Sequence, residues 1–146
     1  MTTRRDLILG AGSVALALAA GAADATPEEA AAAIAAFTAG KPTTKGKISI
    51  DLPEIAENGN TVPLAITVAS PMTADDHVTD ILVVAEGNPL PRLATFHLGP
   101  MAGRAEVATR IRLAATETVT VLAKTSKGAV LLGQKPVKVT IGGCGG

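Results

Sequence analysis

The only cysteine of the chain, Cys144, lies in the C-terminal sequence GGCGG. A lone cysteine has no partner within its own chain, so it is either a reactive thiol or the site of an intermolecular bond. A catalytic thiol needs a helix N-terminus, a histidine or a lysine beside it to lower its pKa. Glycines supply none of these. The segment therefore predicts a thiol that carries a group for other proteins, and not the nucleophile of an enzyme.

Four glycines surround this thiol: Gly142, Gly143, Gly145 and Gly146. Glycine allows nearly all backbone conformations, so the segment predicts a thin, flexible swinging arm that can enter a narrow channel. We expect the arm to begin after Ile141, where the last predicted strand ends, and to extend the thiol up to roughly 10 Å from the domain. Because Gly143 lies beyond that strand, we expect a side chain there to cost the fold no more than about 0.5 kcal/mol.

Two histidines, His77 and His97, are the other candidates for catalysis or metal binding. His77 lies near Asp75, Asp76 and Asp80, but no second histidine is close in sequence to complete a transition-metal site. His97 alternates with apolar neighbours on a predicted strand. We interpret His77 as part of a polar loop and His97 as strand surface, and we predict no cofactor or metal site.

The N-terminus carries the pattern of an export signal. Arg4 and Arg5 precede a short apolar run over residues 7–20, and small residues then offer cleavage sites ending at Ala22 or Ala25. The run is too short to span a bilayer and has signal-peptide flanks. Twin arginines with a modest apolar region favour the route that exports folded proteins. Residues 1–25 are thus predicted to be a twin-arginine signal peptide, and the mature chain is predicted to be periplasmic.

The composition of the mature chain limits its function. About 120 residues remain after cleavage, enough for one domain with its own core. Over the whole chain lysine plus arginine and aspartate plus glutamate number 13 each, and the signal segment carries two of each, so the mature chain is balanced too. No net field therefore favours nucleic acid or an anionic membrane surface. There is no tryptophan or tyrosine, and the chain cannot build the aromatic platform on which single-stranded nucleic acid stacks.

A short helix is predicted to open the mature chain. Residues 26–29 have the pattern of a capping box with Pro27 at the first helical position, and Gly40 is placed to end the helix. The helix is rich in alanine, so we expect it to dock loosely or on a partner. Residues 26–46 are predicted to form this helix and a linker.

Apolar residues then alternate with period two over residues 47–141, which predicts seven or eight strands. The predicted strands are KISIDL (47–52), TVPLAITVA (61–69), DILVVAEG (80–87), PRLATFHLG (91–99), AEVATRIRLA (105–114), ETVTVLAK (117–124), GAVLLG (128–133) and KVTI (138–141). Turn signals such as Asn58-Gly59 and Gly87-Asn88-Pro89 separate them. The expected fold is all-β: an immunoglobulin-like antiparallel β-sandwich over residues 47–141, with the short helix before it and the flexible arm 142–146 after it.

The terminal GGCGG, the strand KVTIGG, and the stretches NGNTVP, SPMTADDHV, GNPLPRLATFH and AEVATRIRLA together resemble the SoxY family. SoxY is the sulfur-carrier subunit of the thiosulfate-oxidising Sox system, and the resemblance covers essentially the whole mature chain. It implies that Cys144 holds sulfur intermediates covalently, with Gly142, Gly143, Gly145 and Gly146 as the arm.

The resemblance also implies partners. SoxY works as a heterodimer with SoxZ, a small β-sandwich protein without its own export signal. A haem c-type enzyme couples thiosulfate to the thiol, a manganese hydrolase releases sulfate, and a molybdenum and haem sulfur dehydrogenase oxidises the remaining sulfur. Those cofactors belong to the partners, and none is expected in this chain.

Other functions stay open from the residues alone. Ubiquitin-like sulfur carriers also end in two glycines, but they carry sulfur on the terminal carboxylate, have a β-grasp fold and are cytoplasmic. The export signal and the lone N-terminal helix argue against that class. An exported thiol-dependent enzyme would turn over by itself, and an immunoglobulin-like interaction module would tolerate the loss of Cys144.

Overall fold

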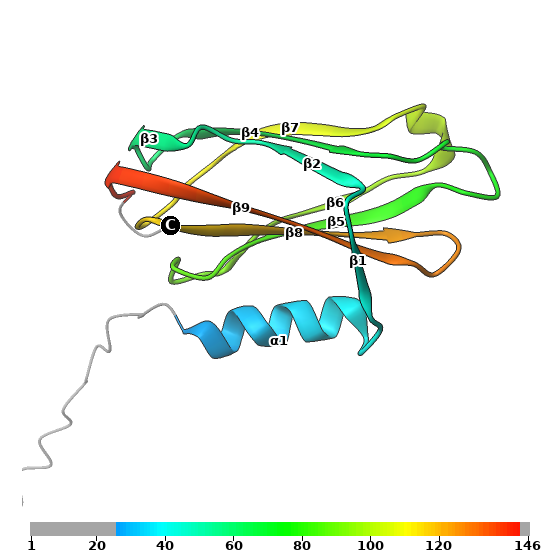
Figure 1. Ribbon diagram of the computed structural model, residues 1–146, viewed down its shortest axis with the longest axis horizontal. Helices are drawn as coiled ribbons and strands as arrows, with labels where there is room; N and C mark the ends of the chain where they lie inside the picture. The colour runs from blue at the N-terminus through cyan, green and yellow to red at the C-terminus, as the bar shows by residue number, and fades with distance from the viewer. Residues whose placement is uncertain (1–25, 144–146) are drawn as a thin grey trace, which may run out of the picture.

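The computed structural model describes residues 26–143 (Figure 1). Two β-sheets lie face to face, and one helix covers the outer side of the larger sheet. The expected β-sandwich with a short N-terminal helix is therefore confirmed. Within residues 26–143, no helix has the length and apolar character needed to cross a bilayer.

The described elements follow one another along the chain as α1 Pro27–Thr38, β1 Thr43–Lys45, β2 Ile48–Asp51, β3 Ile55–Asn58, β4 Val62–Val68, β5 Val78–Ala85, β6 Arg92–His97, the 3₁₀ turn η1 Pro100–Ala102, β7 Ala105–Ile111, β8 Glu117–Thr125 and β9 Val130–Ile141. The larger sheet has the order β1-β9-β8-β5-β6, and β3 also pairs with β9. The smaller sheet has the order β2-β4-β7.

The core between the sheets follows the alternation of apolar residues. On β4 the buried side chains are Val62, Leu64, Ile66 and Val68, each separated by a more exposed neighbour. β5 has a continuous apolar run because it lies between β8 and β6 and is covered on both faces. Its two faces contribute to two different cores, one between the sheets and one beneath the helix.

The helix α1 packs on its own chain, so the expectation that it docks loosely or on a partner is wrong. Ala30 is fully buried in an apolar cluster with Leu82 and Val84 of β5. Its small side chain lets the helix approach the sheet at this point. Figure 1 shows α1 lying along the outer side of the larger sheet. The helix begins at Pro27 as expected, but Thr26 makes no side-chain capping bond.

β9 is one strand where two were expected. It contains the predicted segment 138–141 and most of 128–133, and it pairs with β8 along most of its length. Pro136 lies inside β9 opposite Thr118. A proline removes one donor from the ladder. This is tolerated here because, among the described strands, none pairs with residues 133–137 on the side away from β8.

Two short strands, β1 and β3, were not expected. β1 lies in the predicted linker, and β3 ends at Asn58, the first residue of the Asn58-Gly59 turn signal. Both pair with β9 in parallel, so the sandwich is not wholly antiparallel as expected. Strands of three or four mostly exposed residues are too short to show a periodic pattern in the sequence.

Candidate functional site

The end of β9 leads directly into the glycines that precede Cys144. Of the predicted arm, the structure describes Gly142 and Gly143, whereas Cys144, Gly145 and Gly146 lie outside the described residues. The predicted signal segment 1–25 also lies outside them. What the structure places is therefore the base from which the thiol is held.

Three backbone hydrogen bonds join this base to two loops. The N–H of Gly59 donates to the carbonyl of Ile141 (N···O 2.7 Å), and the N–H of Leu113 donates to the carbonyl of Gly59 (2.8 Å). The N–H of Gly143 in turn donates to the carbonyl of Leu113 (2.9 Å). We call Gly59, Leu113 and the segment 141–143 the glycine clasp, because these bonds tie together the ends of β3, β7 and β9.

Close backbone approach explains why glycine occupies this clasp. A Cβ on Gly59 would run into the carbonyl oxygen of Leu113, and one on Gly142 would run into the carbonyl oxygen of Ala114. A Cβ on Gly143 would lie 2.9 Å from the carbonyl oxygen of Gly59, closer than real Cβ atoms come. None of the three glycines has the positive φ that favours glycine. A lack of space, and not a need for conformational freedom, excludes side chains here.

Gly142 and Gly143 thus belong to the folded domain, and two expectations are corrected. The arm does not leave the domain at Ile141, because Gly143 is buried and hydrogen bonded. Only one peptide link, about 3.8 Å between Cα atoms, separates Gly143 from Cys144. The expected low cost of a side chain at Gly143 is also wrong, since that space is occupied. The carrier role of the arm residues stays a prediction.

Asn88 holds the loop to which Gly143 is bonded. Its side chain is 0% exposed. Its Nδ2 donates to the carbonyl of Arg112 (2.7 Å), and its Oδ1 accepts from the N–H of Ala114 (2.8 Å). Arg112 and Ala114 are the two neighbours of Leu113 in the chain. The amide of Asn88 therefore fixes the backbone on both sides of Leu113, whose carbonyl accepts the hydrogen bond from Gly143. Buried polar side chains that are fully hydrogen bonded make a loop rigid.

Glu117, at the start of β8, is bonded to the loop between β5 and β6 that contains Asn88 (the Asn88 loop). The N–H of Gly87 donates to its Oε1 (3.0 Å), while its Oε2 is buried with no hydrogen-bond partner in the described part of the chain. Burial raises the pKa of the Glu117 carboxyl; hydrogen bonds from the backbone of Gly87 and Ala115 lower it, and the charge of Glu86 raises it. The net pKa of Glu117 is raised. Glu117 is thus a titratable group bonded to the loop that carries Asn88.

Sequence reasoning did not single out Gly59 or Asn88 as functional residues. Both belong to the turn signals Asn58-Gly59 and Gly87-Asn88-Pro89, which by themselves predict only turns between strands. The turn prediction is correct within one residue: Asn58 ends β3, and Gly59 and Asn60 form the turn before β4. No local pattern, however, distinguishes a turn asparagine from one whose amide is buried against a distant loop.

His97 lies away from the clasp. Its ring is largely exposed, and its Nδ1 is 2.6 Å from Oδ1 of Asp80. Burial by itself raises the pKa of Asp80, but hydrogen bonds from Thr79 and His97 and the charges of His97 and Lys124 outweigh it, so that pKa is lowered. Asp80 stands near the start of β5, whereas the Asn88 loop follows the end of that strand. At about 3.3 Å per residue, most of a strand separates His97 from the thiol's attachment point.

His77 is part of a polar loop, as interpreted. Its Nδ1 lies 3.0 Å from the carbonyl oxygen of Thr73, and its N–H donates to Oγ of Ser126. Over residues 26–143 no group of three or more histidine, aspartate or glutamate side chains is arranged to hold a metal ion. The described residues thus place no histidine beside the arm to activate its thiol.

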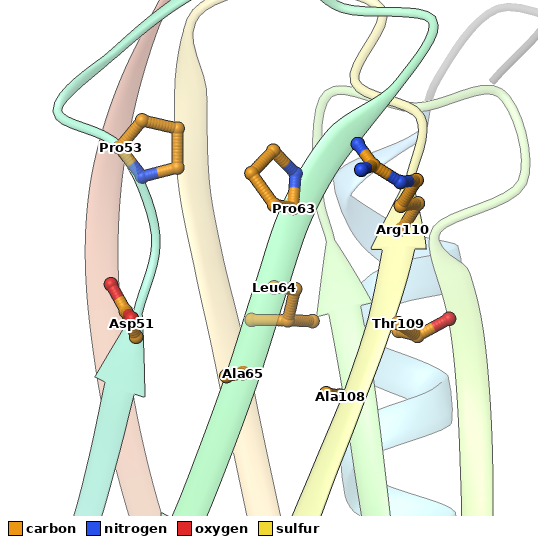
Figure 2. A pocket seen from close by; sticks show the side chains of 8 residues that line it. All are labelled: Asp51, Pro53, Pro63, Leu64, Ala65, Ala108, Thr109 and Arg110. Carbon is orange, nitrogen blue, oxygen red and sulfur yellow. The ribbon is translucent and has the colours of Figure 1, made fainter.

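A shallow groove of about 560 Å³ lies on the smaller sheet (Figure 2). Figure 2 shows its lining along β2, β4 and β7: Asp51, Pro53, Pro63, Leu64, Ala65, Ala108, Thr109 and Arg110. The groove is hollow at Ala65 and Ala108 because their side chains are small. At its edge, Nη1 of Arg110 donates a long hydrogen bond to Oγ1 of Thr61 (3.5 Å). The lining of the groove is mainly apolar, and its polar side chains are those of Asp51, Thr109 and Arg110.

Comparison with known proteins links this arrangement to one family. Residues 34–144, which include Cys144, match the family model described as sulfur oxidation protein SoxY. The structure of the sulfur carrier protein SoxY from Chlorobium limicola f thiosulfatophilum is similar, with a TM-score of 0.65 and 32% identity over 80% of this chain and 100% of that chain. None of the curated proteins matches the chain significantly.

Superoxide reductases share the fold. The enzyme called neelaredoxin from Ignicoccus hospitalis has a TM-score of 0.57 and 17% identity over 64% of this chain and 80% of its own. A putative superoxide reductase from Thermotoga maritima has a TM-score of 0.56 and 19% identity over 66% of this chain and 93% of its own. At this identity the likeness extends to the fold alone.

Proposed function

The chain belongs to the SoxY family of sulfur oxidation proteins, and from this premise we propose that Cys144 is the residue on which it carries sulfur covalently. The protein is a sulfur carrier of the Sox system that works with other Sox proteins, and it is not itself an enzyme. The resemblance read from the sequence is thereby confirmed. The attachment residue, the partners and the compartment are parts of our proposal.

One observation carries the assignment to Cys144. The only thiol of the chain follows the glycine clasp by a single peptide link, and the family match extends to that residue. A carrier needs one reactive atom at the edge of a stable domain, without groups that would make it react on its own. The end of β9 offers such a position: His77 is bonded to Ser126, before the start of β9, and His97 pairs with Asp80, which lies opposite Lys124 near the end of β8.

The proposed chemistry has two steps on the sulfur. First, the Sγ of Cys144 forms a bond with the sulfane sulfur of thiosulfate; one proton leaves, and two electrons pass to a haem c-type partner. Second, water attacks the terminal sulfonate in a manganese hydrolase; sulfate and a proton leave, and a persulfide remains on Cys144. A sulfur dehydrogenase, where present, oxidises that sulfur further. The cofactors reside in the partners.

We also propose that the protein is a periplasmic heterodimer with a SoxZ-like subunit, exported through the twin-arginine signal. Two exposed apolar side chains near the clasp favour a partner at this end: Ile55 on β3 is 58% exposed and Ile141 on β9 is 66% exposed. Exposed large apolar side chains can mark a surface that a partner covers.

Intact mass spectrometry of the carrier complex after reaction with thiosulfate and the haem c-type partner tests the assignment. We expect a thiosulfonate adduct that maps to Cys144, and a persulfide after the hydrolase is added. Cys144→Ser should lose every adduct and all sulfate release, while its thermal unfolding stays unchanged. Sulfate release by the serine variant would refute the proposal, and sulfur on the carboxyl of Gly146 would indicate a carrier of the ubiquitin-like kind.

A further inference from the structure

We propose that the glycine clasp is a fixed pivot for the carrier cysteine, and that Gly59 and Asn88 are positioning residues for its sulfur cargo. The proposal rests on the carrier function of Cys144 and deepens it. It replaces a freely jointed arm that starts at Ile141 with an arm whose first two glycines are held by the domain.

The hydrogen bonds of the clasp favour the bound position of Gly143. Gly59 uses both its N–H and its carbonyl, toward Ile141 and Leu113, and Leu113 likewise uses both, toward Gly59 and Gly143. Releasing Gly143 would leave the carbonyl of Leu113 without this donor at a position where Gly143 is buried. Buried backbone groups are almost always paired, so the bound position of Gly143 is favoured.

The glycines of the clasp are required by close backbone contact. A joint that must swing needs glycine for its wide range of φ and ψ. Here Gly59, Gly142 and Gly143 have no positive φ, and each faces a backbone atom that a Cβ would hit. Glycine at these positions therefore serves close contact between three chain segments, which is the opposite of mobility.

Asn88 holds the backbone around Leu113 in place. The amide of Asn88 bonds to Arg112 and Ala114 on either side of Leu113, and it is fully buried. The carbonyl that receives Gly143 is thus oriented by a side chain from a different loop. Asn88 acts on the cysteine only through this loop, so its role is to position and not to react.

A fixed pivot has a consequence for partner enzymes. While the clasp is closed, the Cα of Cys144 is one peptide link, about 3.8 Å, from the Cα of the bound Gly143. A partner's active site must therefore come close to the clasp, and the direction of the clasp sets the direction of attack. A displacement of about 1 Å can cost of order a hundredfold in rate, so loosening the clasp should reduce turnover without reducing the reactivity of the thiol.

The experiment compares Gly59→Ala with Gly99→Ala in the complex with the SoxZ-like subunit. Both variants add one methyl group, but a Cβ at Gly99 meets nothing within 4 Å and the φ of Gly99 is −139°, which alanine adopts freely. Amide hydrogen exchange of Gly143 by NMR reports the clasp, alkylation by iodoacetamide reports the thiol, and sulfate release by the partner enzymes reports positioning. Gly142→Ala is the second clasp variant, to be used if Gly59→Ala fails to fold.

We expect the amide of Gly143 to be protected from exchange in the unmodified protein and in Gly99→Ala, and to exchange at least about tenfold faster in the clasp variant. Sulfate release should fall at least about tenfold in the clasp variant alone, while alkylation is not slowed. An unprotected Gly143 amide in the unmodified protein would overturn the pivot. So would full sulfate release from a clasp variant whose Gly143 amide has become exposed.

The two proposals fail in different ways. If the unmodified protein takes up no adduct on Cys144 although its Gly143 amide is protected, the carrier function is wrong and the clasp is only structural. If the adduct forms on a protein whose Gly143 amide is unprotected, the carrier function holds and the pivot is wrong.

Discussion

The N–H of Gly143 donates a hydrogen bond to the carbonyl of Leu113 at 2.9 Å, and Leu113 is itself bonded to Gly59. Through this contact the last described residue of the chain is held by the loop that follows β7. The glycines before the carrier cysteine therefore belong to the fold as well as to the arm.

Gly143→Val should destabilise the fold by about 1–3 kcal/mol, as other additions of bulk to tightly packed positions do. Its Cβ would lie 2.9 Å from the carbonyl oxygen of Gly59, so the segment must move and its bond to Leu113 must weaken. Chemical denaturation followed by circular dichroism measures the change. Gly99→Val is the control, because the space around Gly99 is open. Equal stability of the two variants would contradict this expectation.

Asn88→Asp should cost about 1–3 kcal/mol or more, because it places a carboxylate oxygen where Nδ2 now donates to the carbonyl of Arg112. Two acceptors would then face each other in a fully buried position. The control is Asn60→Asp, since Asn60 is exposed. Urea midpoints of the two variants give the comparison, and a midpoint for Asn88→Asp within error of the unmodified protein would argue against a structural amide.

Glu117→Gln should change the pH dependence of stability. Burial raises the folded pKa of Glu117 above its ordinary value of 4.5, so between these two values the folded protein binds more protons than the unfolded chain. Stability therefore falls as the pH rises through this window, and the variant should lack that fall. Glutamine keeps the acceptor for the N–H of Gly87. Thermal unfolding between about pH 4 and 7 tests this, with the exposed Glu57→Gln as control; identical profiles for Glu117→Gln and the unmodified protein would count against it.

Replacing Arg4 and Arg5 by lysines should leave both this chain and its SoxZ-like partner in the cytoplasm. The reason is that the twin-arginine route exports folded proteins, so a heterodimer formed before export can travel on one signal. Cell fractionation with antibodies against both subunits measures the outcome. Partner found in the periplasm of the double variant would show that it has its own route, and co-export would then be wrong.

The sequence by itself determined the strands whose burial leaves a clear apolar pattern, on one face or on both. β4, with four buried apolar residues in alternation, and β5, with its continuous apolar run, were identified correctly because burial imposes a pattern on neighbouring residues. The lone cysteine between glycines also indicated a carrier, because thiol chemistry depends on residue types that the sequence prints directly. Family membership followed from the same residues.

Only the tertiary structure decided what holds the arm. β1 and β3 exist because β9 offers them an edge, and Pro136 is accepted within β9 because that edge is free between them. A glycine reads alike in a sequence whether it is there for freedom or for lack of space. Gly59 and Gly143 meet only after β3, β7 and β9 have been brought to one end of the sandwich, and close contact between distant segments leaves no periodic trace in the chain.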